Sequence, residues 1–303
     1  MRRTIALVTV SLILVAACAT SRPSATPVPS VAPSLQNVRI VPILGSSELA
    51  KGPNRFLFSL TDRANKLVAA PDVSVHLSFF DNAASADAVA FEADSRFLWA
   101  IEGERGLYVA NITFPRAGRW GTRFDATFPD GRKETVRADY DVLETTSTPA
   151  IGAPAPSVDT PTVADFGGNL RAVTTDASPN PRFYELSISD ALAAGKPFVV
   201  AFATPAFCQT QLCGPTLETV KSVASDFPGI TFINVEPYVM AMNGQSLQPV
   251  LTSQGELQPA PWTTAWGLVS EPFIAIVDAE GTVRAKFEGT IGADELRGAL
   301  VGL

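Results

Sequence analysis

Residues 38–145 alternate between apolar and polar side chains with the two-residue period of a half-buried strand. Between two of these runs stands Asp130-Gly131, a dipeptide typical of a tight hairpin. Several short strands at this spacing predict an all-β antiparallel sandwich. The positions assigned to one face in the three clearest runs are Val73, Val75, Leu77 and Phe79; Trp120, Thr122, Phe124, Ala126 and Phe128; and Val136, Ala138, Tyr140 and Val142.

Residues 162–303 follow a different pattern, in which uninterrupted apolar runs are separated by segments of helical periodicity. The run 198–202 predicts a strand buried on both faces, and 230–235 predicts the next strand. Strand, helix and strand in this order predict a parallel pair with a right-handed crossover, and therefore an α/β domain. The apolar face of the intervening helix is formed by Leu217, Val220, Val223, Ala224 and Phe227.

Further elements are expected around this unit. Residues 170–173 predict an edge strand, and residues 189–195 predict a short helix. After the insertion described below, residues 273–277 and 283–287 predict two strands joined by a turn, and residues 293–300 predict a closing helix.

An insertion rich in proline, residues 238–266, carries Trp262 and Trp266. We weigh two interpretations of it. In one, the insertion is a lid or wall over the site described below. In the other, it is a packed peripheral helix and loop whose indoles cover the core.

Residues 1–18 have the organisation of an export signal, with Arg2 and Arg3 before an apolar stretch too short for a membrane span. The tetrapeptide Val15-Ala16-Ala17-Cys18 resembles a bacterial lipobox. This resemblance implies cleavage before Cys18 and attachment of a diacylglyceryl group to its sulfur, so that the protein is anchored in the membrane on its extracytoplasmic side. The alternative is an ordinary signal peptide with an incidental cysteine.

Two segments rich in Pro, Ala, Ser and Thr interrupt the chain. Residues 19–37 bury too little apolar surface to offset their ordering entropy and predict a disordered tether. Residues 146–161 predict a linker between two domains, 38–145 and 162–303, and relative motion of the domains is the default expectation.

The composition places the 303-residue chain among globular proteins, with 46% hydrophobic and 17% charged residues. Its net charge of −7 and the absence of any basic cluster argue against binding to nucleic acid. Nothing in the sequence indicates a cofactor or the oligomeric state.

The chain has 3 cysteines. If Cys18 is lipidated, Cys208 and Cys213 form one remaining pair in a compartment where disulfides persist. They lie between a strand and the helix that opens at Gly214-Pro215, where unpaired N–H groups and the helix dipole stabilise a thiolate. The spacing places Cys208 on the loop and Cys213 at or just before the first helical turn.

Strand, turn, Cys, spacer, Cys, Gly-Pro and helix together resemble the active-site region of the thioredoxin-like superfamily, with a four-residue spacer in place of the usual two. Two registers remain open. In the favoured one, Phe207-Cys208 begins the motif, which makes Cys208 the attacking thiol and Cys213 the resolving thiol. In the other, Cys213-Gly214-Pro215-Thr216 overlays the family's CGPC. The resemblance also implies that Pro272 is the family's cis-proline facing the cysteines.

The stretches 106–110 and 115–120 resemble the immunoglobulin-like envelope modules of the YtkA and copper-resistance type. Copper binding is not expected to come with this resemblance. Such sites use His and Met, whereas residues 38–145 hold one histidine, His76, on the polar side of its strand, and no methionine. No metal site is therefore predicted.

We expect the pair Cys208 and Cys213, with Pro272, to perform thiol–disulfide exchange with extracytoplasmic protein thiols or disulfides. Glu236 and Glu271 are candidate proton acceptors, with the alternative that each is a surface or loop carboxylate. One competing hypothesis is a Sco-like copper metallochaperone, for which Met240 and Met242 offer thioethers. The other is a thioredoxin-like binding lipoprotein in which the disulfide is only structural.

Overall fold

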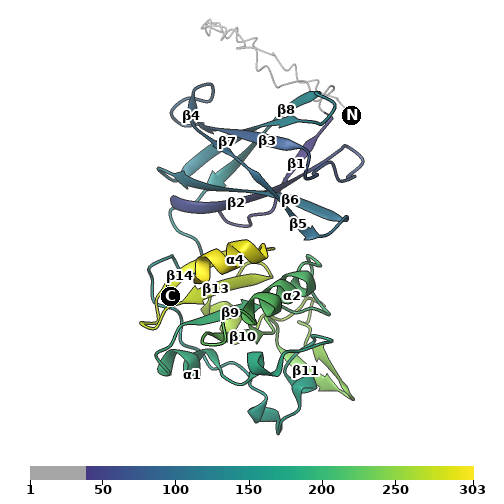
Figure 1. The fold of residues 1–303 in the computed structure, drawn as a ribbon, viewed down its shortest axis with the longest axis vertical. Coiled ribbons are helices and arrows are strands. Elements are labelled where there is room, and N and C mark those ends of the chain that lie inside the picture. The colour runs from purple at the N-terminus through teal and green to yellow at the C-terminus, as the bar shows by residue number, and fades with distance from the viewer. Residues whose placement is uncertain (1–38) are drawn as a thin grey trace, which may run out of the picture. The chain divides into compact units, whose positions relative to one another are not determined.

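The computed structural model describes residues 39–303 (Figure 1). The predictions for residues 1–37, including the export signal, the lipidated Cys18 and the tether, lie outside the described residues. Everything below concerns the compact unit that begins at Val38.

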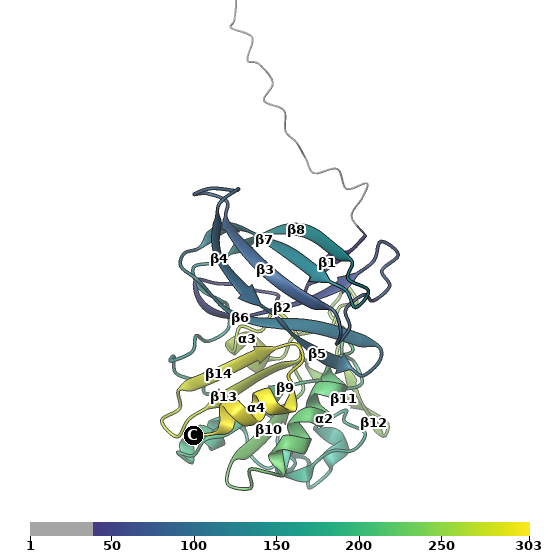
Figure 2. The ribbon, with the colours of Figure 1, turned by 45° about the horizontal axis from the view of Figure 1, so that its top comes forward.

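Residues 41–142 form two four-stranded antiparallel sheets (Figures 1 and 2). Alternate residues of each sheet point into one shared core, which is built largely from aromatic rings such as Phe56, Phe124 and Trp120. The hairpin predicted at Asp130-Gly131 joins β7 to β8, and Gly131 takes the positive φ that the turn requires. The first sheet has the order β1 (Val41–Leu44), β2 (Gly52–Thr61), β6 (Arg105–Phe114), β5 (Arg96–Ile101); the second has the order β4 (Val89–Asp94), β3 (Ser74–Asp81), β7 (Gly118–Thr127), β8 (Lys133–Val142).

The C-terminal part is organised around a four-stranded mixed sheet of order β10, β9, β13, β14. The strand β9 is parallel to β10 and antiparallel to β13, and all five of its residues are buried. Val199 and Ala201 pack with helices α2 and α4 on one face, whereas Phe198, Val200 and Phe202 pack with α1 and Trp266 on the other. The bounds are β9 (Phe198–Phe202), β10 (Thr231–Val235), β13 (Phe273–Val277), β14 (Val283–Glu288), α1 (Ile188–Ala193), α2 (Cys213–Ala224) and α4 (Ala293–Leu300).

Short elements fill the connections of this part. Helix α1 begins after Ser187, whose side chain forms a capping box with Asp190. The insertion contains a two-stranded hairpin and one short helix. These connecting elements are the 3₁₀ helices η2 (Ala164–Phe166), η3 (Leu170–Ala172) and η4 (Pro181–Tyr184), the strands β11 (Met240–Asn243) and β12 (Ser246–Pro249), and helix α3 (Pro261–Ala265).

The predicted fold class, an immunoglobulin-like sandwich followed by an α/β thioredoxin-like domain, is wrong. The part of the chain that the structure describes is mostly β, with fourteen strands in four sheets, and its longest helix has only 12 residues. The edge strand predicted at residues 170–173 is the 3₁₀ helix η3, because the Asn169 side chain accepts a hydrogen bond from the Arg171 N–H and closes a turn. Residues 240–249, predicted only as an insertion, add two strands.

Residues 146–161 pack against the rest of the compact unit. The Lys286 ammonium donates to the hydroxyls of Thr146 and Thr148 at 2.7 and 2.8 Å. Gly267 approaches Ser147 so closely that a Cβ at position 267 would meet the Ser147 carbonyl oxygen, and its positive φ also favours glycine. The domain boundaries at residues 145 and 162 stay predictions.

Candidate redox site

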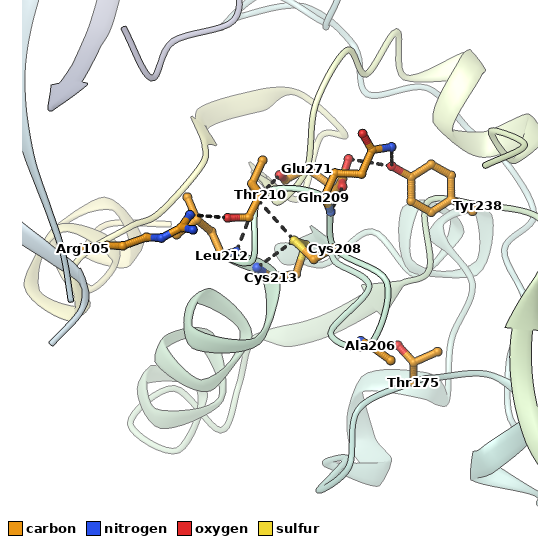
Figure 3. Close-up of a disulfide and its surroundings, with 10 residues drawn as sticks. All are labelled: Arg105, Thr175, Ala206, Cys208, Gln209, Thr210, Leu212, Cys213, Tyr238 and Glu271. Carbon is orange, nitrogen blue, oxygen red and sulfur yellow. Dashed lines mark hydrogen bonds between the residues drawn. A yellow bond between two sulfur atoms is a disulfide. The ribbon is translucent and has the colours of Figure 1, made fainter. Parts of the chain in front are cut away.

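A disulfide joins Cys208 and Cys213 on the loop between β9 and α2 (Figure 3). The Cα atoms of the two cysteines are 5.8 Å apart, which is an ordinary disulfide separation. Cys213 is the first residue of α2 and is fully buried, whereas Cys208 is half-buried on the loop. The two sulfurs therefore differ in access, and a partner molecule can reach Cys208 more readily than Cys213.

Two polar groups lie at the Cys208 sulfur. The backbone N–H of Cys213 donates to it at 3.1 Å, and the Thr210 hydroxyl lies 3.3 Å from it (Figure 3). The first of these groups belongs to the opening turn of α2, where the helix dipole also favours negative charge. After reduction, the Cys213 N–H would favour negative charge on the Cys208 sulfur.

Glu271 is the carboxylate closest to the disulfide. One of its oxygens lies within 4.8 Å of both sulfurs. Its carboxylate accepts hydrogen bonds from the Gln209 N–H at 3.0 Å and from the Tyr238 hydroxyl at 2.8 Å. Glu271 is buried, with 8% of its surface exposed, and lies in the loop before β13, so it is a loop carboxylate and not a surface one.

Pro272 directly follows Glu271 and is buried at the start of β13. The Glu271–Pro272 peptide bond is cis. The Thr210 hydroxyl donates to the Glu271 carbonyl at 3.0 Å, which holds this peptide segment beside the cysteine loop. That Pro272 itself faces the cysteines stays a prediction.

Glu236, the other candidate proton acceptor, is also a buried loop carboxylate and does not lie on the surface. It follows the last residue of β10, and one carboxylate oxygen accepts from the Thr175 N–H at 2.6 Å. The other oxygen has no hydrogen-bond partner among the described residues. Burial raises the pKa of Glu236 to about 7. Glu236 is outside the group of ligand atoms formed by the two sulfurs and Glu271.

Replacement of Glu236 by glutamine is expected to stabilise the protein at pH 8 and to have little effect near pH 5. The folded-state pKa of about 7 lies above the ordinary value of 4.5, so the parent loses stability as pH rises through about 7. Glutamine keeps an acceptor for Thr175 and never ionises. Urea unfolding at the two pH values should show a gain on the order of 2 kcal/mol at pH 8. The exposed control Glu280→Gln should show no pH-dependent difference, and equal changes in both variants would contradict the assignment.

The side chains that could bind a metal lie in different parts of the structure. Cys208, Cys213 and Glu271 form one group, whereas His76 lies on β3 and pairs with Asp94 at 2.8 Å. That hydrogen bond raises the pKa of His76. His76 therefore pairs with a carboxylate of its own sheet and is not part of the group formed by Cys208, Cys213 and Glu271.

Met240 and Met242 lie on β11, and Met242 is exposed. Neither the cysteine loop nor Glu271 shares a strand pairing with β11, which pairs with β12.

A cavity of about 570 Å³ opens beside Glu271. Residues of the insertion 238–266 form much of the cavity wall, as expected if the insertion is a lid or wall over the site. The two indoles fit the other interpretation, in which they cover the core. Trp266 is fully buried against Phe202, and the Trp262 indole N–H donates to the Glu236 carbonyl at 2.7 Å. The cavity is lined by Gln209, Pro237, Tyr238, Gly255, Glu256, Leu257, Pro259, Thr263, Leu268, Val269, Ser270 and Glu271.

Three residues of the site were missed from the sequence. Tyr238 reaches Glu271 from the end of β10, Thr210 contacts the Cys208 sulfur, and Arg105 donates from β6 to the cysteine loop at 2.7 and 2.8 Å. Thr210 stands within the motif, and its hydroxyl between two cysteines was a usable signal. Nothing in the local sequence marks Tyr238 or Arg105.

No model of a known protein family matches the chain, and the comparison with curated proteins also found no match. Among solved structures, a DUF4426 family protein from Pseudomonas aeruginosa PAO1 is similar at 13% identity and a TM-score of 0.25, over 35% of this chain and 90% of that one. MtrC from Shewanella baltica OS185 is similar at 13% identity and a TM-score of 0.25, over 49% of this chain and 28% of that one.

A family 76 glycoside hydrolase from a bovine Bacteroides thetaiotaomicron strain is similar at 10% identity and a TM-score of 0.23, over 34% of this chain and 22% of that one. Similarities at this level carry no argument about fold or function. Separately, none of the helices within residues 39–303 is long and apolar enough to cross a membrane.

Proposed function

We propose that the protein is a membrane-anchored, extracytoplasmic thiol–disulfide oxidoreductase that acts through Cys208 and Cys213. The observation that carries this proposal is the asymmetry of the pair. The Cys208 sulfur is partly accessible and accepts a hydrogen bond from the Cys213 N–H, whereas the Cys213 side chain is buried at the helix N-terminus. Exchange requires this combination of a stabilised, accessible thiolate and a nearby resolving thiol.

In the reducing direction, the Cys208 thiolate attacks one sulfur of a substrate disulfide. A mixed disulfide forms between Cys208 and that sulfur, the substrate S–S bond breaks, and the other substrate sulfur leaves as a thiolate. Cys213 then loses its proton and attacks the Cys208 sulfur, which releases the second substrate thiolate and leaves the Cys208–Cys213 disulfide. Two electrons pass from the protein to the substrate. The same steps in reverse oxidise a substrate dithiol.

Glu271 is the proposed proton acceptor for Cys213. Its carboxylate lies within 4.8 Å of both sulfurs, and water has little access to it. The hydrogen bonds from Gln209 and Tyr238 fix its orientation while leaving further lone pairs free. Glu236 is less suited to this role because it is outside this group of atoms.

The cavity beside Glu271 is the proposed place for the substrate segment next to its reacting sulfur. Its volume is within the range of ligand pockets. Pro272 follows Glu271 in the chain, and proline offers no N–H that would need a partner. We therefore propose a polypeptide substrate over a small thiol.

The proposal is tested by turnover of a peptide disulfide, with glutathione as electron donor and full-length Cys18→Ser protein as catalyst. We expect catalysis well above the glutathione background. A rate equal to the background in both the reducing and the oxidising direction would overturn the proposed activity.

Metal handling is a second candidate, favoured by the group of Cys208, Cys213 and Glu271, since Cu(I) prefers thiolate ligands. It predicts tight, stoichiometric Cu(I) binding by the reduced protein in competition with a chelator. Binding that is lost in Cys208→Ser and accompanied by no exchange activity would favour this candidate over the redox proposal.

The membrane anchor is proposed from the sequence around Cys18 alone. Replacement of Cys18 by serine should move the protein from the detergent phase to the aqueous phase in a partition experiment. Equal partitioning of the parent and the variant would contradict lipidation at this cysteine.

A further inference from the structure

Arg105, the first residue of β6, contacts the cysteine loop from the β-sandwich (Figure 3). Its guanidinium donates to the Thr210 carbonyl at 2.7 Å and to the Gln211 side-chain oxygen at 2.8 Å. Both acceptors lie between the two cysteines. The forked guanidinium can satisfy two acceptors at once with fixed geometry.

The part of the loop that Arg105 holds has an unusual backbone. Gln211 has a φ of 63°, in the left-handed region that residues with a side chain seldom occupy. Such a conformation persists where surrounding contacts maintain it. Arg105 contacts the peptide before Gln211 and the Gln211 side chain itself, so it is well placed to maintain this conformation.

The same loop segment positions the polar groups of Thr210 and Cys213 that lie at the Cys208 sulfur. The Thr210 hydroxyl lies 3.3 Å from the Cys208 sulfur and accepts from the Leu212 N–H at 3.3 Å. The next N–H, that of Cys213, donates to the Cys208 sulfur at 3.1 Å. A change in the backbone at Gln211 would therefore move the Thr210 hydroxyl and the Cys213 N–H relative to the Cys208 sulfur.

The sandwich is itself fixed to the C-terminal part near Arg105. Arg55 of β2 forms a largely buried ion pair with Glu295 of α4 at 2.8 Å and also donates to the Thr290 carbonyl. Arg96 of β5 pairs with the same carboxylate at 2.9 Å. Strand β5 lies beside α2 (Figures 1 and 2). Arg105 thus reaches the loop from a surface that is held in place.

We propose that Arg105 is a positioning residue through which the β-sandwich sets the reactivity of Cys208. The inference rests on the proposed exchange function and adds a role for the sandwich, which the sequence left without one. Arg105 touches neither sulfur and acts through Thr210 and Gln211. By holding the loop, it keeps the Cys213 N–H where it stabilises the Cys208 thiolate.

The test uses Arg105→Ala in the full-length Cys18→Ser protein. Loss of the clamp should destabilise the thiolate, which makes the disulfide harder to reduce. We expect the equilibrium constant for reduction by glutathione to fall about tenfold, equivalent to about 30 mV for a two-electron couple. Alkylation of reduced Cys208 at pH 7 should slow several-fold, and its pH profile should move to higher pH.

Three further variants separate positioning from other effects. Arg119→Ala removes an exposed arginine of the same sandwich that pairs with Asp141, and it should leave both readouts unchanged. Arg105→Lys keeps the charge without the fork and should retain only part of the parent's reactivity. Gln211→Ala removes one of the two acceptors on the exposed loop and should shift both readouts in the same direction as Arg105→Ala.

An equilibrium constant and an alkylation profile unchanged in Arg105→Ala would overturn the proposal. A full rescue by Arg105→Lys together with no shift in Gln211→Ala would also overturn it, because charge alone would then suffice. These readouts are measured on the disulfide itself, so they decide the inference even if the parent fails to turn over a peptide disulfide. That second failure would overturn the proposed function alone.

Discussion

Replacement of Cys208 by serine is expected to abolish thiol–disulfide exchange. Cys208 carries the accessible sulfur, and the buried Cys213 cannot reach a partner molecule in its place. Turnover of a peptide disulfide should fall to the uncatalysed glutathione rate. The serine side chain has the shape of cysteine with a hydroxyl in place of the thiol, so Thr210 and the Cys213 N–H can contact it as they contact the sulfur.

Replacement of Cys213 by serine provides the matched control, with a different expected result. The attacking thiol remains, but the mixed disulfide can no longer be resolved from within the protein. Covalent complexes between Cys208 and the substrate should therefore accumulate and be visible on non-reducing gels. Equal trapping by both single variants, or trapping by Cys208→Ser alone, would contradict the assigned roles and favour the second register of the motif.

Replacement of Trp266 by alanine is expected to lower the free energy of unfolding by about 3–5 kcal/mol, the usual range for a buried tryptophan. The indole has no exposed surface and packs against Phe202 at 5.3 Å between ring centroids. Phe202 ends the strand that leads to the cysteine loop. The loss should appear as a lower midpoint in urea unfolding.

Two control variants are compared with Trp266→Ala. Trp266→Phe should cost less, because the indole N–H has no hydrogen-bond partner among the described residues and its removal leaves no acceptor unsatisfied. Leu251→Ala, at a side chain that is 54% exposed, should change stability by no more than about 0.5 kcal/mol. A Trp266→Ala variant as stable as Leu251→Ala would show that the insertion does not pack on the sheet in solution.

Local patterns predicted many individual elements. The apolar run at 198–202 is the buried strand β9, and the helical apolar face ending at Ala224 and Phe227 belongs to α2 and its C-terminal turn. The same patterns failed at residues 170–173, where the capping side chain of Asn169 decided the local structure. Hydrophobic periodicity reports which face is buried, but it does not report such side-chain competition.

The fold class was beyond the reach of these local patterns. Strand orientation depends on how distant segments pair, and β13 runs antiparallel to β9 although both have continuous apolar runs. The composition of residues 146–161 predicted a linker, yet Thr146 and Thr148 accept hydrogen bonds from Lys286. Small polar residues occur in free linkers and in packed segments alike, so composition alone cannot distinguish them.

The candidate site was partly predictable for the same reason. Cys208, Cys213 and Pro272 stand in recognisable local contexts. The burial of Glu271 beside the sulfurs and the contact from Arg105 arise only when segments far apart in sequence meet. A single sequence contains no record of such distances.

The reduction potential of the Cys208–Cys213 disulfide, together with the alkylation rate of each reduced thiol across pH, tests the central claim most directly. Structural disulfides of secreted proteins typically have potentials below about −300 mV, and exchange-active pairs lie above this value. Our account predicts a potential above about −300 mV, with Cys208 alkylated rapidly at a lowered pKa and Cys213 protected. A potential below that value, with both thiols unreactive, would contradict it and identify the disulfide as structural.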